Sequence, residues 1–262
     1  MTEQVPVTPL VEEYRRLLKL SQPQRLERAE QLIRRPTSLA EAFSESRQQF
    51  ASFDHADEDF YDPVPPRTAL PKNPKGLGST VEVAARLSGG GRKRVLGDDR
   101  LSFSYIDREL VPSRTKSGAV FADGKSIRSG LRLDLLLANH HDGIPIIGEV
   151  KVAQDKDPFF ALIQALTHAA YLSTPSQLKR LARVYSKKKI KVGKKLDVYL
   201  LLAQAPAAAT YWFELREAAR RLAARLVEQK SLTDGVRRIA AVDLDLIDGR
   251  MRVSKRFSYP DA

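Results

Sequence analysis

The chain has 262 residues, no cysteine, and 44 Lys or Arg against 32 Asp or Glu, which gives a formal net charge of +12. The lack of cysteine excludes disulfide frameworks, zinc sites with thiolate ligands, iron–sulfur clusters and cysteine nucleophiles. The length and the 42% content of hydrophobic residues are typical of one or two globular domains and exclude a fibrous repeat or a disordered tail. We expect a cytoplasmic protein without a membrane partner, because no run approaches about 18 apolar residues and the first residues do not resemble a secretion signal.

Charge is unevenly distributed along the chain. Residues 1–62 carry 8 Lys or Arg and 12 Asp or Glu, a net charge of −4, so residues 63–262 carry +16. A strongly basic surface attracts polyanions, and nucleic acid is the commonest polyanion in the cytoplasm. The charge therefore favours a nucleic-acid partner, and its alternative is a solvated surface without a partner.

The first 76 residues predict helices followed by a linker. Apolar residues recur at helical spacing from Pro9 to Ile33, with a break at Ser21 to Pro23, and a third helical stretch runs from Leu39 to Phe50. An acidic patch, Asp54 to Asp62, precedes the proline-dense stretch from Pro63 to Gly76. We predict three segments: a helical acidic N-terminal region at 1–62, a proline-rich linker at 63–76 and a further domain at 77–262.

The remaining residues alternate between helical and strand patterns. A helix with Ser79 or Thr80 as its N-cap is predicted from Ser79 to Leu87. Strand signals, which are short apolar or alternating runs bounded by Gly, Asn and Asp, occur at 101–108, 131–138, 145–152 and 196–203. Amphipathic helices are predicted at 157–172 and 211–229, and a final hairpin joins 238–247 to 250–258 through Asp248-Gly249. Interleaved strands and helices predict an α/β sheet that is covered by helices.

The stretch from Leu131 to Val152 predicts a hairpin that collects charged residues on one face. A two-residue turn at Asp142-Gly143 would place Asp134 opposite Lys151, whereas a longer symmetric loop would place it opposite Glu149. In both registers Asp134, Glu149 and Lys151 share a face, with Arg132 nearby, unless a β-bulge intervenes. The other face is predicted to be an apolar layer for a helix to cover, formed by Leu133, Leu135, Leu137, Val150 and Val152.

Two carboxylates on neighbouring strands repel each other unless a positive charge lies between them. A divalent cation supplies that charge, and oxygen ligands suit Mg²⁺ or Mn²⁺, which also accept phosphate oxygens. The ammonium of Lys151, on the same face as Glu149, could hold a metal-bound water or hydroxide and offset charge that develops on phosphorus. The hairpin therefore predicts a metal-assisted phosphoryl site.

Asp134, followed after fourteen residues by Glu149-Val150-Lys151, resembles the core motif of the PD-(D/E)XK nuclease superfamily, with its restriction-endonuclease-like fold. Gln164 on the next helix falls where many members carry Gln, although His168 stands at the position of the usual Tyr and Leu133 at that of the usual Pro. The resemblance implies a central mixed β-sheet flanked by helices. It implies metal binding by Asp134, Glu149 and the carbonyl of Val150, and catalytic-site roles for Lys151 and Gln164. An additional acid from a preceding helix would be Glu82, with Glu109 as its competitor.

The resemblance and the charge together predict a metal-dependent nuclease that hydrolyses phosphodiester bonds of DNA, as an endonuclease that uses Mg²⁺ or Mn²⁺. RNA stays an alternative substrate, and a homodimer stays an alternative to the monomer. The alternative function is a catalytically silent nucleic-acid-binding or assembly module with the same fold. A second alternative is a scaffold whose acidic N-terminal region binds a protein partner.

Two other stretches are predicted to lie at the surface. The basic run from Lys179 to Lys195 is interpreted as a phosphate-contacting arm rather than a solvated loop, and the basic residues of the helix at 211–229 are expected to bind the nucleic-acid backbone with it. Asp243 and Asp245 alternate with apolar residues, which predicts that both lie on the solvated face of an edge strand.

Overall fold

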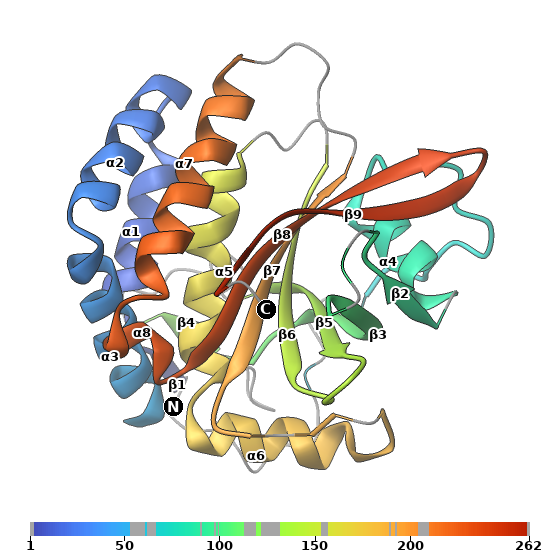
Figure 1. Cartoon of the computed structure of the whole chain (residues 1–262). Coiled ribbons are helices and arrows are strands. Elements are labelled where there is room, and N and C mark those ends of the chain that lie inside the picture. Colours follow the sequence, from blue (N-terminus) through green and yellow to red (C-terminus); the bar gives the residue numbers. More distant parts are fainter. Residues whose placement is uncertain are drawn as a thin grey trace.

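The computed structural model describes residues 3–52, 61, 67–89, 91–96, 98, 100–112, 119–121, 132–152, 157–188, 190–191, 193–203 and 210–260. They form a mixed α/β structure around a seven-stranded sheet with the order β2-β3-β5-β6-β7-β8-β9 (Figure 1). Its strands are β2 (Arg92–Arg94), β3 (Ser102–Leu110), β5 (Leu133–Asn139), β6 (Pro145–Lys151), β7 (Leu196–Ala203), β8 (Val236–Ile247) and β9 (Arg250–Tyr259). Strands β6, β7 and β8 are parallel, and the other pairs are antiparallel. The predicted α/β class is therefore confirmed.

The helices are α1 (Pro9–Leu18), α2 (Gln22–Arg34), α3 (Pro36–Ser52), α4 (Thr80–Ser88), α5 (Pro158–Leu172), α6 (Pro175–Val184), α7 (Thr210–Leu226) and α8 (Lys230–Thr233), with a short 3₁₀ turn at Ser186–Lys188. A separate parallel pair joins β1 (Glu3–Val5) to β4 (Ala119–Phe121). Helices α1, α5 and α6 each begin at a proline, after Thr8, Asp157 and Thr174, whose side chains accept a backbone N–H of the first turn. These caps explain why α1 and α5 begin where the sequence predicts them, and α6, which was not predicted, begins in the same way.

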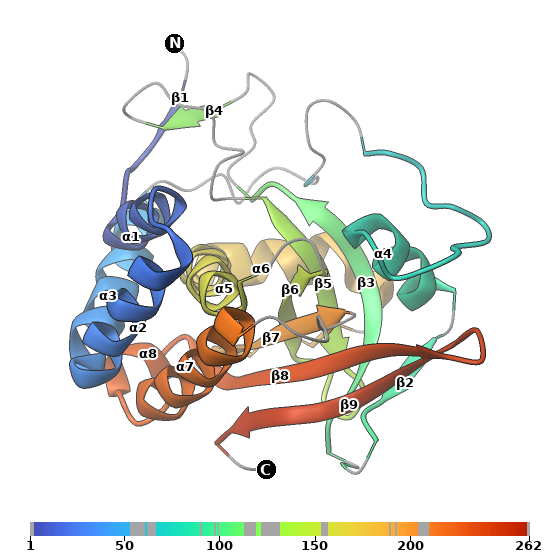
Figure 2. The same ribbon diagram turned by 90° about the horizontal axis from the view of Figure 1, so that it is seen from above.

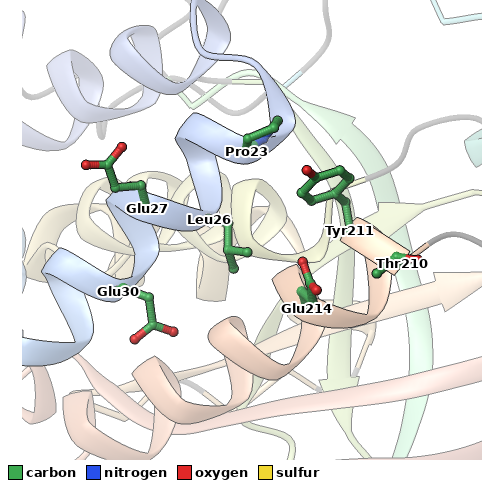
Figure 3. Close-up of a pocket in the computed structure, with 7 residues that line it drawn as sticks. All are labelled: Pro23, Leu26, Glu27, Glu30, Thr210, Tyr211 and Glu214. Carbon is green, nitrogen blue, oxygen red and sulfur yellow. The ribbon is translucent and has the colours of Figure 1, made fainter.

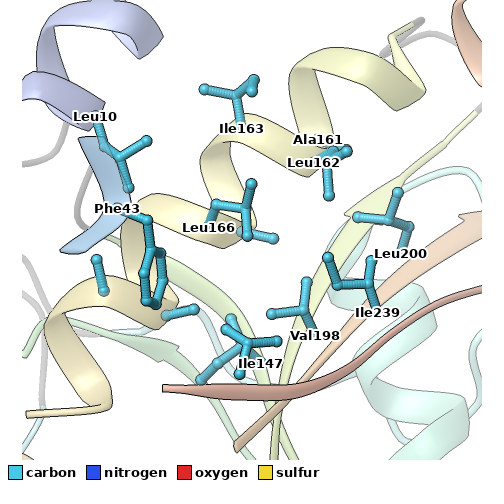
Figure 4. Close-up of a cluster of buried hydrophobic side chains, with 14 of the residues drawn as sticks. Leu10, Phe43, Ile147, Ala161, Leu162, Ile163, Leu166, Val198, Leu200 and Ile239 are labelled. Carbon is cyan, nitrogen blue, oxygen red and sulfur yellow. The ribbon is translucent and has the colours of Figure 1, made fainter. Parts of the chain in front are cut away.

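One face of the sheet packs against the helical layer, as the view along the sheet shows (Figure 2). Helix α5, which is buried except at Gln164, packs on Ile147, Val198, Leu200 and Ile239 of the sheet, and α1 and α3 cover that helix from outside (Figure 4). The N-terminal helices thus belong to the same hydrophobic cluster as the sheet. Residues 53–60 and 62–66, which include most of the predicted acidic patch and the start of the linker, lie outside the described residues, so the predicted boundary between segments stays a prediction.

The other face of the sheet curls around a second core. Leu135, Leu137 and Val150 pack there with Val83 and Leu87 of α4. The two edges of the sheet meet where the Leu96 N–H donates to the Val253 carbonyl at 2.7 Å, which leaves a nearly closed, barrel-like sheet. The predicted apolar layer is therefore covered by the curl of the sheet as well as by α4. Leu133 does not belong to this layer, because its side chain, at the first residue of β5, joins the hydrophobic cluster under α5.

Gly148 lies in β6 where the curled sheet leaves little space. A Cβ atom there would lie 3.1 Å from Leu201 Cδ1 and 3.2 Å from Leu135 Cβ. We expect Gly148→Ala to lower the free energy of unfolding by about 1–3 kcal/mol, because neighbouring strands must separate to admit the methyl group. Urea denaturation would measure the loss against Gly193→Ala, whose Cβ meets no atom within 4 Å. Equal stability of the two variants would contradict the packing described.

Two surface predictions need correction. Asp243 is buried, at 2% exposure, and forms an ion pair with Arg256, because β8 lies between β7 and β9 and is not an edge strand; Asp245 is exposed as predicted. The first part of the basic run is helical up to Val184, and Arg180 is fully buried, with its guanidinium 4.0 Å from the centre of the Tyr61 ring. Lys189 and Val192 of that run lie outside the described residues, as does Leu131 before β5.

Candidate functional site

The β5–β6 hairpin sets the geometry of the candidate site. Leu135 pairs with Gly148 and Leu136 with Ile147, so the same register places Asp134 opposite Glu149. This is the longer-loop register of the two that the sequence allows. Asp134, Glu149 and Lys151 consequently share one face of the hairpin, as predicted. Helix α5 covers this charged face, although the sequence analysis expected a covering helix only on the opposite, apolar face.

Glu149 is fully buried beside a second carboxyl group. Burial raises the pKa of Glu149 well above its usual range, and the charge of Asp134 raises this pKa further, whereas Lys151 opposes both effects. Asp134 Oδ2 accepts the Val150 N–H at 3.0 Å, which holds its carboxylate against β6. Oε2 of Glu149 has no hydrogen-bond partner among the described residues. The pair therefore offers a buried oxygen ligand that protein groups leave unused.

Lys151 and Gln164 complete the polar group. Lys151 Nζ donates to Glu149 Oε1 at 3.2 Å and to Gln164 Oε1 at 3.4 Å, and it lies 5.6 Å from the centre of the Phe160 ring. Phe160, Gln164 and His168 are four residues apart on α5, so they lie on one face of this helix. The structure thus brings Asp134, Glu149, Lys151 and Gln164 together.

His168 of α5 lies next to Glu149, with 3.8 Å between His168 Nδ1 and Glu149 Oε2. Its side chain is fully buried, and neither ring nitrogen has a hydrogen-bond partner in the described part of the chain. Burial, with a smaller contribution from the charge of Lys151, lowers the pKa of His168 from 6.5 to about 3. His168 is therefore neutral at pH 7.

We expect acid to destabilise the protein in part through His168. A lowered pKa means that the unfolded chain binds this proton more tightly, so the stability is fully present above pH 6.5 and is lost as pH falls towards 3. The variant His168→Leu, which has a similar volume, should lose less stability than the wild type over this range. Denaturation with urea at a series of pH values measures the difference, and parallel curves for the two proteins would contradict it.

The N-terminal helices support this end of α5, which local sequence patterns did not reveal. Arg25 of α2 forms an ion pair with Asp157, the N-cap of α5, at 3.0 Å, and its guanidinium lies 5.4 Å from the centre of the Phe160 ring. Tyr14 of α1 stacks on the same ring, with 4.9 Å between centroids. Because Arg25 and Asp157 are 132 residues apart, no local spacing could have predicted the pair.

The structure does not bring Glu82 close to Asp134, Glu149 and Lys151. Its carboxylate accepts the backbone N–H groups of Gly76 at 3.1 Å and Gly78 at 3.0 Å, and α4 packs on the opposite face of the sheet. Glu109, the alternative to Glu82, lies on β3. Its neighbour Arg108 pairs with Leu135 of β5, so the same register places Glu109 opposite Asp134.

Glu109 already has cationic neighbours. Its Oε2 lies 2.8 Å from Arg132 and its Oε1 lies 3.1 Å from Arg108. Its backbone φ of 51° is unusual for a residue other than glycine. Of the two additional acids considered, Glu109 is thus the one on the strand next to the carboxylate pair.

The residues at the centre of the site fit a divalent cation. Among the described residues, His, Cys, Asp and Glu form no metal-binding group of three or more. An ion at this site would therefore have two carboxylates and a backbone carbonyl, such as that of Val150, as protein ligands. Two opposed carboxylates with one unpartnered buried oxygen form an oxygen-donor set that suits Mg²⁺ or Mn²⁺, which retain several waters.

Comparisons with protein-family models, curated proteins and solved structures find no match for this chain. Among the described residues, every helix is too short or too polar to span a bilayer.

Proposed function

We propose that the protein is a metal-dependent nuclease that hydrolyses phosphodiester bonds of DNA with Mg²⁺ or Mn²⁺. The observation that carries the proposal is the fully buried Glu149 beside the half-buried Asp134, with the Lys151 ammonium 3.2 Å from Glu149 Oε1. A buried acid with a raised pKa, beside a second acid and an amine, is a costly arrangement that is typical of functional sites.

The order of elements supports a restriction-endonuclease-like core. Helix α4 precedes the antiparallel strands β3, β5 and β6, and α5 then leads to β7, which is parallel to β6. In this order the paired carboxylates lie on β5 and β6 and Gln164 lies on the next helix, which is the arrangement that the resemblance implies. In this proposal the curl that brings β9 to Leu96 would be an addition to such a core.

Each side chain of the proposed site would have a separate role in hydrolysis. Asp134, Glu149 and the carbonyl of Val150 would hold the ion, which when bound supplies a water of lowered pKa and polarises the phosphate. Lys151 would position the attacking water and offset the negative charge that develops on the phosphate oxygens. Gln164 would orient Lys151 through its 3.4 Å hydrogen bond, and the Phe160 ring shields the ammonium from solvent.

Cations close to the site would bind the DNA backbone. The Arg132 side chain is 41% exposed and forms an ion pair with Glu109. The Arg25 side chain is 20% exposed and forms an ion pair with Asp157. The basic segment Lys187–Lys195 lies farther away, because the Lys191 N–H donates to the carbonyl of Gly143 in the β5–β6 turn. Gly143 is six residues from Glu149, about 20 Å along an extended strand. That segment would contact DNA remote from the cleaved bond.

A cleavage assay tests the proposal. Purified protein is incubated with supercoiled plasmid, linear duplex, single-stranded DNA and RNA in Mg²⁺, in Mn²⁺ and in EDTA. We expect cleavage of DNA that requires the ion, and binding that weakens steeply as salt increases. Binding of DNA without cleavage of any substrate in either ion would contradict the nuclease and favour the catalytically silent nucleic-acid-binding module.

A further inference from the structure

A groove lies between α2 and α7, on the outside of the helical layer. Its first part has a volume of about 670 Å³ (Figure 3), and a neighbouring hollow of about 420 Å³ shares three of its residues. We call the two together the α2–α7 groove; its lining residues used below are Leu26, Glu27, Glu30, Tyr211, Phe213, Glu214 and Glu217. The residues of the candidate nuclease site do not line it.

The groove is acidic although the chain is strongly basic. Four glutamates and one arginine, Arg221, line it, which gives a local charge of −3 in a chain of +12. Arg221 is paired with Glu30 at 2.7 Å, and Glu217 is paired with Arg220 at 2.6 Å.

Glu27 and Glu214 remain available for a ligand. Both are exposed, and neither forms an ion pair with another described residue. Figure 3 shows Glu27 on α2 and Glu214 on α7. Two such carboxylates can accept charged hydrogen bonds from a cationic partner without first breaking an internal ion pair.

The groove also exposes apolar surface. Tyr211 and Phe213 are 40% and 39% exposed, and they are two of the five large hydrophobic residues that the described structure leaves exposed. Trp212 and Leu215, by contrast, are buried on the inner face of α7. Exposed aromatic side chains beside a half-buried Leu26 are typical of the apolar centre of a protein–protein interface with a charged rim.

We propose that the α2–α7 groove binds a basic amphipathic segment of a partner protein. Apolar side chains of the segment would pack on Leu26, Tyr211 and Phe213, and its Lys or Arg residues would pair with Glu27 and Glu214. The negative charge disfavours a nucleic acid here, since phosphates would approach unpaired carboxylates. The site is separate from the proposed nuclease function and does not depend on it.

The test uses a fluorescent amphipathic peptide of about 14 residues built from Leu and Lys at helical spacing, with a Leu/Glu peptide of the same pattern as its counterpart. Fluorescence anisotropy with the full-length protein should show binding of the Leu/Lys peptide and none of the Leu/Glu peptide. The double variant Glu27→Gln/Glu214→Gln should weaken binding about tenfold, and Phe213→Ala should weaken it by a similar factor.

The matched control is Glu41→Gln/Glu45→Gln, which removes two exposed carboxylates from α3. It should leave the affinity unchanged, and thermal unfolding checks that every variant is folded. Equal weakening by the two double variants would overturn the proposal, because it would show attraction to any acidic surface. Concentration-dependent dimerisation that Phe213→Ala abolishes would also overturn it, because the occupant would then be a second copy of this chain.

Discussion

Replacement of Lys151 by alanine is expected to lower the rate of metal-dependent DNA cleavage by about 100- to 1,000-fold, the usual cost of losing one group that stabilises charge in a transition state. Lys151 is 5% exposed, and its ammonium donates to Glu149 and Gln164, so alanine would remove the positive charge from the centre of the proposed site. The rate of plasmid nicking at saturating Mn²⁺ measures the loss.

The control for this prediction is Lys195→Ala. Lys195 is exposed in the basic segment that precedes β7, so its loss should weaken DNA binding and leave the maximal rate unchanged. Cleavage by Lys151→Ala at the wild-type rate would remove the proposed mechanism. A fall confined to affinity would make Lys151 a phosphate-binding residue without a part in the chemical step.

Asp134→Asn is expected to leave the metal-free protein at least as stable as the wild type and to abolish its stabilisation by Mn²⁺. The asparagine Oδ1 can still accept the Val150 N–H, and the repulsion that raises the pKa of Glu149 is removed. For the wild type, Mn²⁺ at 100 times its dissociation constant should add about 2.7 kcal/mol to the free energy of unfolding. Thermal or urea denaturation with and without Mn²⁺ measures both effects.

Asp245→Asn is the matched control, because Asp245 is exposed on β8 and should not affect the response to the ion. Retained stabilisation by Mn²⁺ in Asp134→Asn would count against the metal site, and a large loss of metal-free stability would show that the carboxylate has a structural role instead.

The raised pKa of Glu149 also predicts the direction in which the stability and the metal binding of the protein change with pH. A raised pKa means that the folded, metal-free protein holds this proton, so its contribution to stability is present below the ordinary value of 4.5 and is lost as pH rises through the raised value. Metal binding requires the carboxylate, so stabilisation by Mn²⁺ should increase over the same rise in pH.

The elements that local rules govern could be predicted from the sequence. The starts of α1 and α5 with their caps and prolines, the Asp248-Gly249 turn and the buried strand β7 depend on residues adjacent in the chain. The convergence of Asp134, Glu149 and Lys151 was predictable for the same reason, since the alternation of side chains in a hairpin fixes the shared face in either register.

The tertiary structure decided which distant residues surround that face. It placed Arg25 and Tyr14 against the start of α5, left Glu82 on the opposite side of the sheet, and turned the basic segment towards the far end of the hairpin. It also buried Asp243, because β9 pairs with β8 and covers its edge. The periodicity of a sequence indicates which face of a helix or strand is apolar. Which other element packs on that face depends on contacts between elements that are far apart in the chain.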